Sequence, residues 1–127
     1  MSLRSDLARV RGLGSAKTGT HHFWHQRLTA IALIPLGLWL VTSLVCIMRS
    51  DYGDALTWVA KPHVTILLVA TLAAMFYHLK LGLQTVLEDY LHHEGLKLAS
   101  IIGLNLGTVL CALASIVAVL RISFGTN

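Results

Sequence analysis

The stretch from Leu28 to Met48 reads LTAIALIPLGLWLVTSLVCIM and contains no charged side chain. Two more apolar runs follow it, at about 64–87 and 98–120. Each run is close to the ~20 residues that an α-helix needs to cross a hydrocarbon core about 30 Å thick. A helix satisfies its own backbone hydrogen bonds in lipid, and the alternating pattern of a barrel strand is absent from these runs. The sequence therefore predicts an all-α integral membrane protein with three transmembrane helices.

The composition excludes a soluble or a disordered protein. Of the 127 residues, 55% are hydrophobic and 13% are charged, and the mean hydropathy is +0.70. A soluble domain carries about 25% charged residues, and a disordered one combines high charge with low hydrophobicity. Half of the ten basic residues precede the first apolar run, namely Arg4, Arg9, Arg11, Lys17 and Arg27. No basic patch interleaved with aromatic residues follows, so we expect no nucleic-acid partner.

The same pattern predicts the helix bounds and the orientation. We expect a single anchor domain over 1–127, with an N-terminal arm at 1–22 and transmembrane helices at about 24–49, 62–89 and 97–121. Basic residues concentrate on the inner side of a membrane, so the N-terminus is expected to be cytoplasmic and the C-terminus across the bilayer. The initial Met favours a bacterial cytoplasmic membrane over a mitochondrial inner membrane.

Polar connectors separate the predicted helices. The first comprises 49–54 and 61–63 and is expected to be a loop, with Pro62 in the first turn of the next helix. The second spans 88–95, with Gly95 as the expected break. In the third apolar run, small residues recur every four positions, which favours close approach of another helix. These residues are Gly103, Gly107, Cys111 and Ser115.

His78 is the side chain that points most directly to chemistry. It lies 16 residues past Pro62, which at the rise of a helix is roughly 24 Å into the membrane. Ionisable side chains at such depth are costly and are usually functional. Three uses are open: a hydrogen bond across helices, a proton relay, or ligation of a metal such as haem iron. Gly82, one turn away, leaves a surface free of side chain on which a flat macrocycle could lie. The pattern alone favours the interhelical hydrogen bond over the haem ligand.

The haem hypothesis requires a second polypeptide. A low-spin electron-transfer haem has two axial ligands, and this chain offers no second His or Met that is clearly at the depth of His78. Three other histidines lie at the predicted inner boundary and one at the outer boundary: His21, His22, His25 and His63. A haem bound by His78 would therefore be shared with a partner subunit.

Two groups of residues at the predicted inner boundary each allow a structural and a functional interpretation. Arg27 is either an ordinary snorkelling cation or a partner for an anionic group such as a haem propionate, and the pattern favours the former. Asp89 and Tyr90 are either a solvated helix end or part of a quinone site. In such a site the phenol donates a hydrogen bond to a quinone carbonyl and the carboxylate passes protons from water. The spacing alone favours the helix end.

Residues 78–90, HLKLGLQTVLEDY, resemble the signature H-x-x-x-G-x-x-x-[VI]-[LI]-x-D-Y of the small, D-type membrane-anchor subunits of succinate dehydrogenase, respiratory complex II. His21 followed by Arg27-Leu-Thr-Ala30 resembles the H-x(5)-R-x-T-A element that opens the first helix in that family. The doubled His21-His22 makes the matching histidine ambiguous, and Lys80 departs from the family pattern. The number of helices and the chain length agree with the family, so the resemblance covers nearly the whole sequence.

The resemblance implies a bundle of helices shared with a larger, C-type cytochrome b anchor subunit, with iron–sulfur and flavoprotein subunits docked on the inner face. His78 would be one axial ligand of a b-type haem, while Arg27 and His21 would lie near its propionates. Tyr90 would hydrogen-bond ubiquinone, and Asp89 would supply protons. The chain alone cannot oxidise succinate, because it contains no dinucleotide-binding glycine motif and no cysteines spaced for a cluster.

Two other functions are open at this point. The same architecture could anchor a quinol:fumarate reductase, since the direction of the reaction depends on the quinone and on the partner subunits. A small non-redox membrane protein could instead use His78 and Asp89 as a proton relay.

Overall fold

The computed structural model describes residues 6–11 and 19–125, and within them it contains helices and no strands. The helices are α1 (Asp6–Val10), α2 (Gly19–Ile47), α3 (Tyr52–Val59), α4 (Pro62–Tyr90) and α5 (Glu94–Ser123). Among these, α2, α4 and α5 are long and apolar enough to cross a membrane. The predicted all-α class with three candidate transmembrane helices is confirmed.

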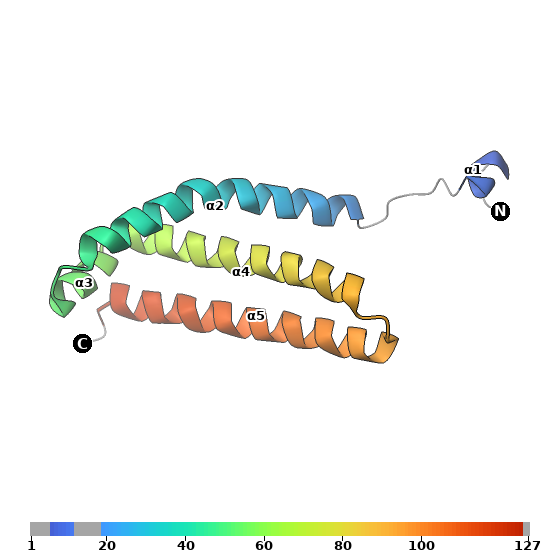
Figure 1. Cartoon of the computed structure of the whole chain (residues 1–127). Coiled ribbons are helices and arrows are strands. Elements are labelled where there is room, and N and C mark those ends of the chain that lie inside the picture. The colour runs from blue at the N-terminus through green and yellow to red at the C-terminus, as the bar shows by residue number, and fades with distance from the viewer. Residues whose placement is uncertain (1–5, 12–18, 126–127) are drawn as a thin grey trace.

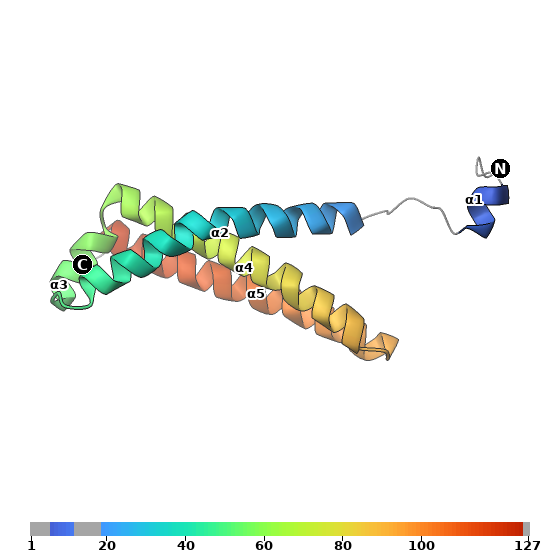
Figure 2. The ribbon, with the colours of Figure 1, turned by 45° about the horizontal axis from the view of Figure 1, so that its top comes forward.

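The three long helices run antiparallel to their neighbours, and α4 lies between α2 and α5 (Figure 1). α4 packs against both of these helices. α2 crosses α4 at an angle, whereas α4 and α5 run alongside each other (Figure 2). One end of the molecule gathers the start of α2, the end of α4 and the start of α5, and we call it the Tyr90 end. The opposite end, which we call the α3 end, holds α3 and the C-terminus (Figure 1).

The observed helix ends differ in detail from the predicted ones. α2 begins at Gly19, five residues before the predicted start at 24, so His21 and His22 belong to a helix and not to an arm. The rest of the predicted arm includes residues 1–5 and 12–18, which lie outside the described residues. α4 begins at Pro62, where the missing N–H of proline removes no helical hydrogen bond.

The second connector is shorter than predicted. α4 continues to Tyr90 and α5 starts at Glu94, so only residues 91–93 separate the two helices. The His93 side chain accepts a hydrogen bond from the backbone N–H of Leu96 at 3.5 Å and so caps α5. With that cap in place, Gly95 lies inside the first turn of α5 and not at a break.

The first connector folds into a short helix that the sequence analysis missed. Residues 52–59 form α3, which Asp51 precedes in an extended conformation. The Trp58 ring stacks on Trp39 of α2, with centroids 6.1 Å apart and planes 21° apart. The glycine and aspartates of this connector are typical of turns, but burial of the indole against α2 favours a helix. Tertiary contact therefore overrides the local turn preference.

The isolated chain has almost no core. Its buried hydrophobic residues among those described are Val64 and Leu81, and both belong to α4. Large apolar side chains are exposed along α2 and α5, including Ile31, Leu38 and Leu110. In a helical membrane protein, such side chains face lipid or another transmembrane helix. The exposed apolar surface of these helices is therefore typical of a protein embedded in a membrane.

Candidate functional site

The side chain of His78 is held by a hydrogen bond across the α2–α4 interface. Its Nδ1 lies 2.9 Å from Oγ1 of Thr29, and both residues are half-buried. The Thr29 hydroxyl also lies 2.8 Å from the backbone oxygen of His25 and 3.1 Å from that of Gln26, one turn earlier in α2. Nε2 of His78 makes no hydrogen bond to any residue that the structure describes, so this nitrogen is uncommitted within the chain.

Gly82 lies one turn beyond His78 and faces the same helix. A Cβ atom built on Gly82 would lie 3.5 Å from Nε2 of Gln26, so the Gln26 side chain covers the glycine. We call the set formed by Gln26, Thr29, His78 and Gly82 the α2–α4 seam. The glycine that the sequence left as a bare surface is thus partly covered by a neighbouring polar side chain.

The seam contains polar atoms without partners. Oε1 of Gln26 and Nε2 of His22, one turn earlier in α2, are buried and make no hydrogen bond. Buried polar groups are costly unless they are satisfied, and in membrane proteins ordered water or another subunit often satisfies them. These atoms mark the part of the seam nearest the Tyr90 end as the place where a further polar group is needed.

A second polar pair links the same two helices outside the seam. Nδ1 of His25 lies 2.5 Å from the hydroxyl of Tyr77, on the exposed side of the interface. The two rings are tilted at 50° with centroids 5.8 Å apart. The interface between α2 and α4 therefore carries two independent imidazole–hydroxyl contacts, one half-buried and one exposed.

The structure places Arg27 and His21 on the exposed surface near the start of α2. The guanidinium carbon of Arg27 lies 5.2 Å from the centre of the Phe23 ring, a cation–π contact within its own helix. His21 is exposed, whereas its neighbour His22 is half-buried. Of the two adjacent histidines, His21 is therefore the one open to a ligand outside the chain.

Asp89 and Tyr90 form the last turn of α4. Tyr90 is 78% exposed, and its hydroxyl makes no hydrogen bond within the described part of the chain. Asp89 lines an open hollow of about 670 Å³ between the end of α4 and the start of α5. The other residues of this hollow are Glu88, Leu91, His92, Glu94, Lys97, Leu98 and Ile101. The carboxylate is therefore placed among polar groups at the helix end, while the phenol is free to bind a group from outside.

The structure does not bring the two predicted sites together. Twelve residues separate His78 from Tyr90 on one helix, which is roughly 18 Å along its axis. Arg27 and His21 lie on the half of α2 nearer the Tyr90 end. The candidate residues are therefore spread from the middle of α4 to the Tyr90 end and do not share a single pocket.

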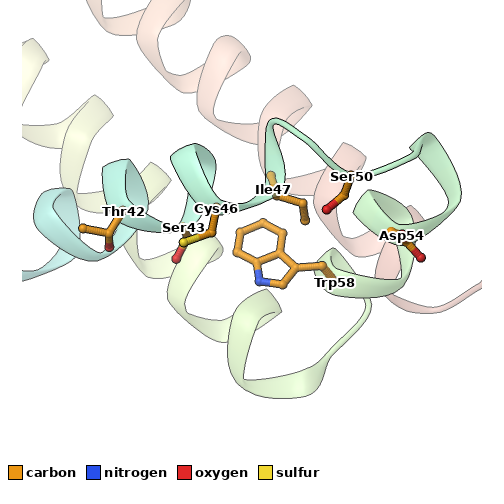
Figure 3. A pocket seen from close by; sticks show the side chains of 7 residues that line it. All are labelled: Thr42, Ser43, Cys46, Ile47, Ser50, Asp54 and Trp58. Carbon is orange, nitrogen blue, oxygen red and sulfur yellow. The ribbon is translucent and has the colours of Figure 1, made fainter.

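Two further hollows contain none of the predicted site residues. One of about 410 Å³ lies at the α3 end, where Trp58 lies beneath the last turns of α2 (Figure 3). The other, of about 240 Å³, is a mostly apolar groove between α4 and α5. It is lined by Ala73, Phe76, Tyr77, Lys80, Thr108, Val109, Ala112 and Ile116.

The ligands that a metal ion requires differ from those that a haem requires. Among residues 6–11 and 19–125, no three His, Cys, Asp or Glu side chains are grouped so that they could hold a metal ion. An axial haem ligand is a single imidazole, and His78 presents one uncommitted nitrogen for this role. The residues therefore fit one half of a haem site.

Thr29, Gln26 and Tyr77 were not predicted as site residues. A signal was available for the first two, because His22, Gln26 and Thr29 recur at intervals of four and three residues, which places them on one face of a helix. Tyr77 carries no such signal, since its partner His25 is 52 positions away in the sequence.

Comparison with known proteins gives one family. The family model described as succinate dehydrogenase/fumarate reductase transmembrane subunit matches residues 1–120. The succinate dehydrogenase hydrophobic membrane anchor subunit of Rickettsia bellii is 35% identical over 116 residues, which cover 91% of this chain and 93% of the relative. The corresponding subunit of Rickettsia conorii is 30% identical over 91% of this chain and 92% of the relative.

A more distant relative comes from Reclinomonas americana. Its succinate dehydrogenase membrane anchor subunit is 27% identical over 88 residues, which cover 67% of this chain and 73% of the relative. No solved structure matches the chain significantly. On the family match and these relatives, the chain belongs to the succinate dehydrogenase/fumarate reductase transmembrane-subunit family, and it is similar to the succinate dehydrogenase membrane anchors.

Proposed function

We propose that this chain is the small anchor subunit of a succinate:quinone oxidoreductase, in which His78 provides one axial ligand to a b-type haem shared with a partner subunit. The observation that carries the proposal is the geometry of His78. One ring nitrogen is engaged by Thr29 and the other is uncommitted, in the middle of a helix long enough to cross a membrane. A metal-ligating histidine characteristically uses its second nitrogen in this way.

This chain would hold the haem together with the larger, C-type cytochrome b anchor subunit, which would supply a histidine of its own. When bound, haem b supplies a one-electron store. This chain would contribute the Nε2 ligand and the apolar walls of α2 and α4. Exposed Arg27 and His21 would pair with the propionates, because both present donors near the inner boundary.

Tyr90 and Asp89 would form this chain's part of a ubiquinone site. Reduction of a quinone to a quinol takes two electrons and two protons. The Tyr90 hydroxyl, exposed and without a hydrogen bond in the described chain, would donate one to a carbonyl oxygen of the quinone and hold it at the helix end. The adjacent Asp89 lies in an open polar hollow and would deliver protons from the inner aqueous side.

The electrons must come from other chains. Iron–sulfur and flavoprotein subunits would dock on the Tyr90 end and oxidise succinate, and this chain would hold them at the bilayer. The Tyr90 end would then face the cytoplasm of a bacterium, in agreement with the basic residues that precede α2.

A quinol:fumarate reductase is the second candidate, because the description of the matching family covers both enzymes. The two share the proposed site, and the potential of the quinone decides the direction. A non-redox proton relay has less support, since the relatives from Rickettsia are succinate dehydrogenase anchors.

The proposal is tested by purifying the native complex through a tag on this chain. We expect flavoprotein, iron–sulfur and larger anchor subunits to co-purify, a b-type spectrum on reduction with dithionite, and succinate-driven reduction of ubiquinone. A colourless chain that purifies without these subunits would refute the proposal and favour the non-redox alternative. A complex that oxidises a low-potential quinol with fumarate faster than it reduces ubiquinone would identify the reductase instead.

A further inference from the structure

The Thr29 hydroxyl has one proton and three acceptors within hydrogen-bond distance. Two are backbone oxygens of its own helix, on His25 at 2.8 Å and on Gln26 at 3.1 Å. The third is Nδ1 of His78 on α4 at 2.9 Å. A threonine inside a helix commonly donates its proton to the carbonyl four residues earlier. The hydroxyl proton can form a good hydrogen bond to only one acceptor. Whether it is donated to a carbonyl of α2 or to His78 therefore decides which ring nitrogen of His78 carries the hydrogen.

If the proton goes to the His25 carbonyl, the Thr29 oxygen can only accept from His78. Nδ1 must then carry the hydrogen of the neutral ring, and Nε2 is left with the lone pair. In the opposite arrangement Thr29 donates to Nδ1, and Nε2 carries the hydrogen and cannot bind a metal. The two states of one hydroxyl therefore correspond to a ring that can ligate iron and a ring that cannot.

Thr42 shows which state the helix prefers when no imidazole is near. Its hydroxyl lies 2.8 Å from the oxygen of Leu38 and 2.9 Å from that of Trp39, the same pattern about three and a half turns further along α2. No residue of another helix hydrogen-bonds Thr42 among those described. The intrahelical bond thus forms without help from His78, and Thr29 has the same local geometry before its interhelical contact is added.

From this geometry we infer that Thr29 is a positioning residue: its hydroxyl accepts the Nδ1–H of His78 and thereby holds Nε2 unprotonated and oriented for an axial bond to haem iron. The inference rests on the proposed function, since it concerns the same imidazole. It adds a residue of α2 to the determinants of the site. The seam is half-buried, so water competes weakly for the ring nitrogen.

Loss of such a supporting hydrogen bond typically weakens metal binding or activity by about 10- to 100-fold. An acceptor at Nδ1–H also raises the basicity of the ligating nitrogen, which favours the oxidised iron. Removal of the Thr29 hydroxyl should therefore shift the midpoint potential of the haem in the positive direction. It should also lower the haem content of the purified complex.

The test compares Thr29→Val, which keeps the shape but lacks the hydroxyl, with Thr29→Ser, which keeps the hydroxyl. Thr42→Val is the matched control, since it removes the same intrahelical bond from the same helix without touching an imidazole. Each complex is measured for haem per flavin, for the midpoint potential of the haem and for its electron paramagnetic resonance spectrum. We expect a positive shift and loss of haem in Thr29→Val, recovery in Thr29→Ser and wild-type values in Thr42→Val.

Thr29→Val with the haem content, potential and resonance spectrum of the wild type would overturn the inference and leave the proposed function standing. Equal losses in Thr29→Val, Thr29→Ser and Thr42→Val would also overturn it, because they would reveal a general packing effect. A wild-type complex without haem b would instead refute the haem part of the proposed function, and the inference would fall with it.

Discussion

The two sides of α4 make different contacts with the neighbouring helices α2 and α5. On the side of α2, contacts between the helices include the bond from His78 to Thr29, the pair His25–Tyr77 and the cover of Gly82 by Gln26. On the side of α5, a groove of about 240 Å³ is lined mainly by apolar side chains. Thr108, on that side, donates its hydroxyl to the carbonyl of Leu104 in its own helix.

The difference shows how one helix can serve two purposes in a membrane. Lipid provides no hydrophobic force that drives helices together, so association depends on packing and on a few polar bonds. On the side of α5, apolar side chains line the middle of the interface, and hydrogen bonds lie at its ends, from the Thr65 hydroxyl to Ser123 and from the Lys97 ammonium to the carbonyl of Glu88. On the side of α2, a hydrogen bond lies in the middle of the helix, at His78. This bond places a particular nitrogen in a particular direction, which is what a ligand site needs.

The largest effect is expected at the helix end, beyond both sides of α4. Replacing Tyr90 by Phe removes the proposed donor to the quinone and should slow succinate-driven quinone reduction by about 10²-fold, the lower range for loss of one hydrogen-bond donor to a reacting oxygen. The spectrum of the haem should stay unchanged, because the seam is untouched. Tyr52→Phe is the matched control, since both tyrosines are 78% exposed and Tyr52 lies at the α3 end.

Dye reduction by the soluble subunits serves as the internal reference for that measurement. A Tyr90→Phe complex that reduces ubiquinone at the wild-type rate would remove Tyr90 from the mechanism. Equal slowing of the dye and quinone assays would point to damaged assembly and would not support a quinone role.

A bulky side chain at Gly82 should selectively disrupt the side of α4 that faces α2. Leu at this position extends well beyond the Cβ, which already lies 3.5 Å from Gln26, and overpacking of this kind costs about 1–3 kcal/mol. Ala adds only the Cβ and should be tolerated. We expect Gly82→Leu to lose haem and to lower the melting temperature of the complex while Gly82→Ala resembles the wild type. Wild-type haem content in both variants would show that α2 does not pack against Gly82 as it does in the structure.

The side of α4 that faces α5 offers the converse test at Lys80. A charge in the centre of a transmembrane helix costs ~2.5–3.5 kcal/mol, and Lys80, which lies off-centre and can snorkel, should cost less. Lys80→Met keeps the length and removes the charge. We expect the detergent-solubilised complex to melt at a slightly higher temperature with an unchanged haem spectrum. A marked loss of stability would mean that the ammonium binds an anionic group.

The smallest effect is expected for the exposed pair His25–Tyr77. Hydrogen bonds between membrane helices average about 0.6 kcal/mol in double-mutant cycles. The cycle of His25→Phe, Tyr77→Phe and the double variant should give a coupling energy of that size from reversible unfolding, with haem content unchanged. A coupling energy near zero would mean that, of the polar contacts between α2 and α4, only those of the seam stabilise the interface. A loss of haem would mean that the His25–Tyr77 pair also supports the haem ligand.

The lengths of the apolar runs were sufficient to predict α2, α4 and α5, because a helix is the only spanning element for a run of this length. The ends were harder, since capping by His93 and the continuation of α4 to Tyr90 depend on local contacts. α3 was missed because the stacking of Trp58 on Trp39 involves residues 19 positions apart, which no local pattern records.

The candidate site was predicted one residue at a time and not as an assembly. His78 stands out in the sequence because an ionisable group interrupts an apolar run. Its partner Thr29 belongs to another helix 49 positions away, and the crossing point of two helices is set by packing over their whole length. The prediction that another helix approaches Gly103 and Gly107 has no counterpart among the described residues, where a Cβ atom built on either glycine would meet no atom of another helix within 4 Å.

The central claim, that His78 binds haem iron, is tested most directly by the reduced-minus-oxidised spectrum of a purified His78→Ala complex. His63→Ala, at the α3 end of the same helix, serves as the control. The account predicts that the b-type absorbance disappears from His78→Ala, returns when imidazole is added to fill the space, and is unchanged in His63→Ala. A His78→Ala complex with the b-type spectrum of the wild type would contradict it.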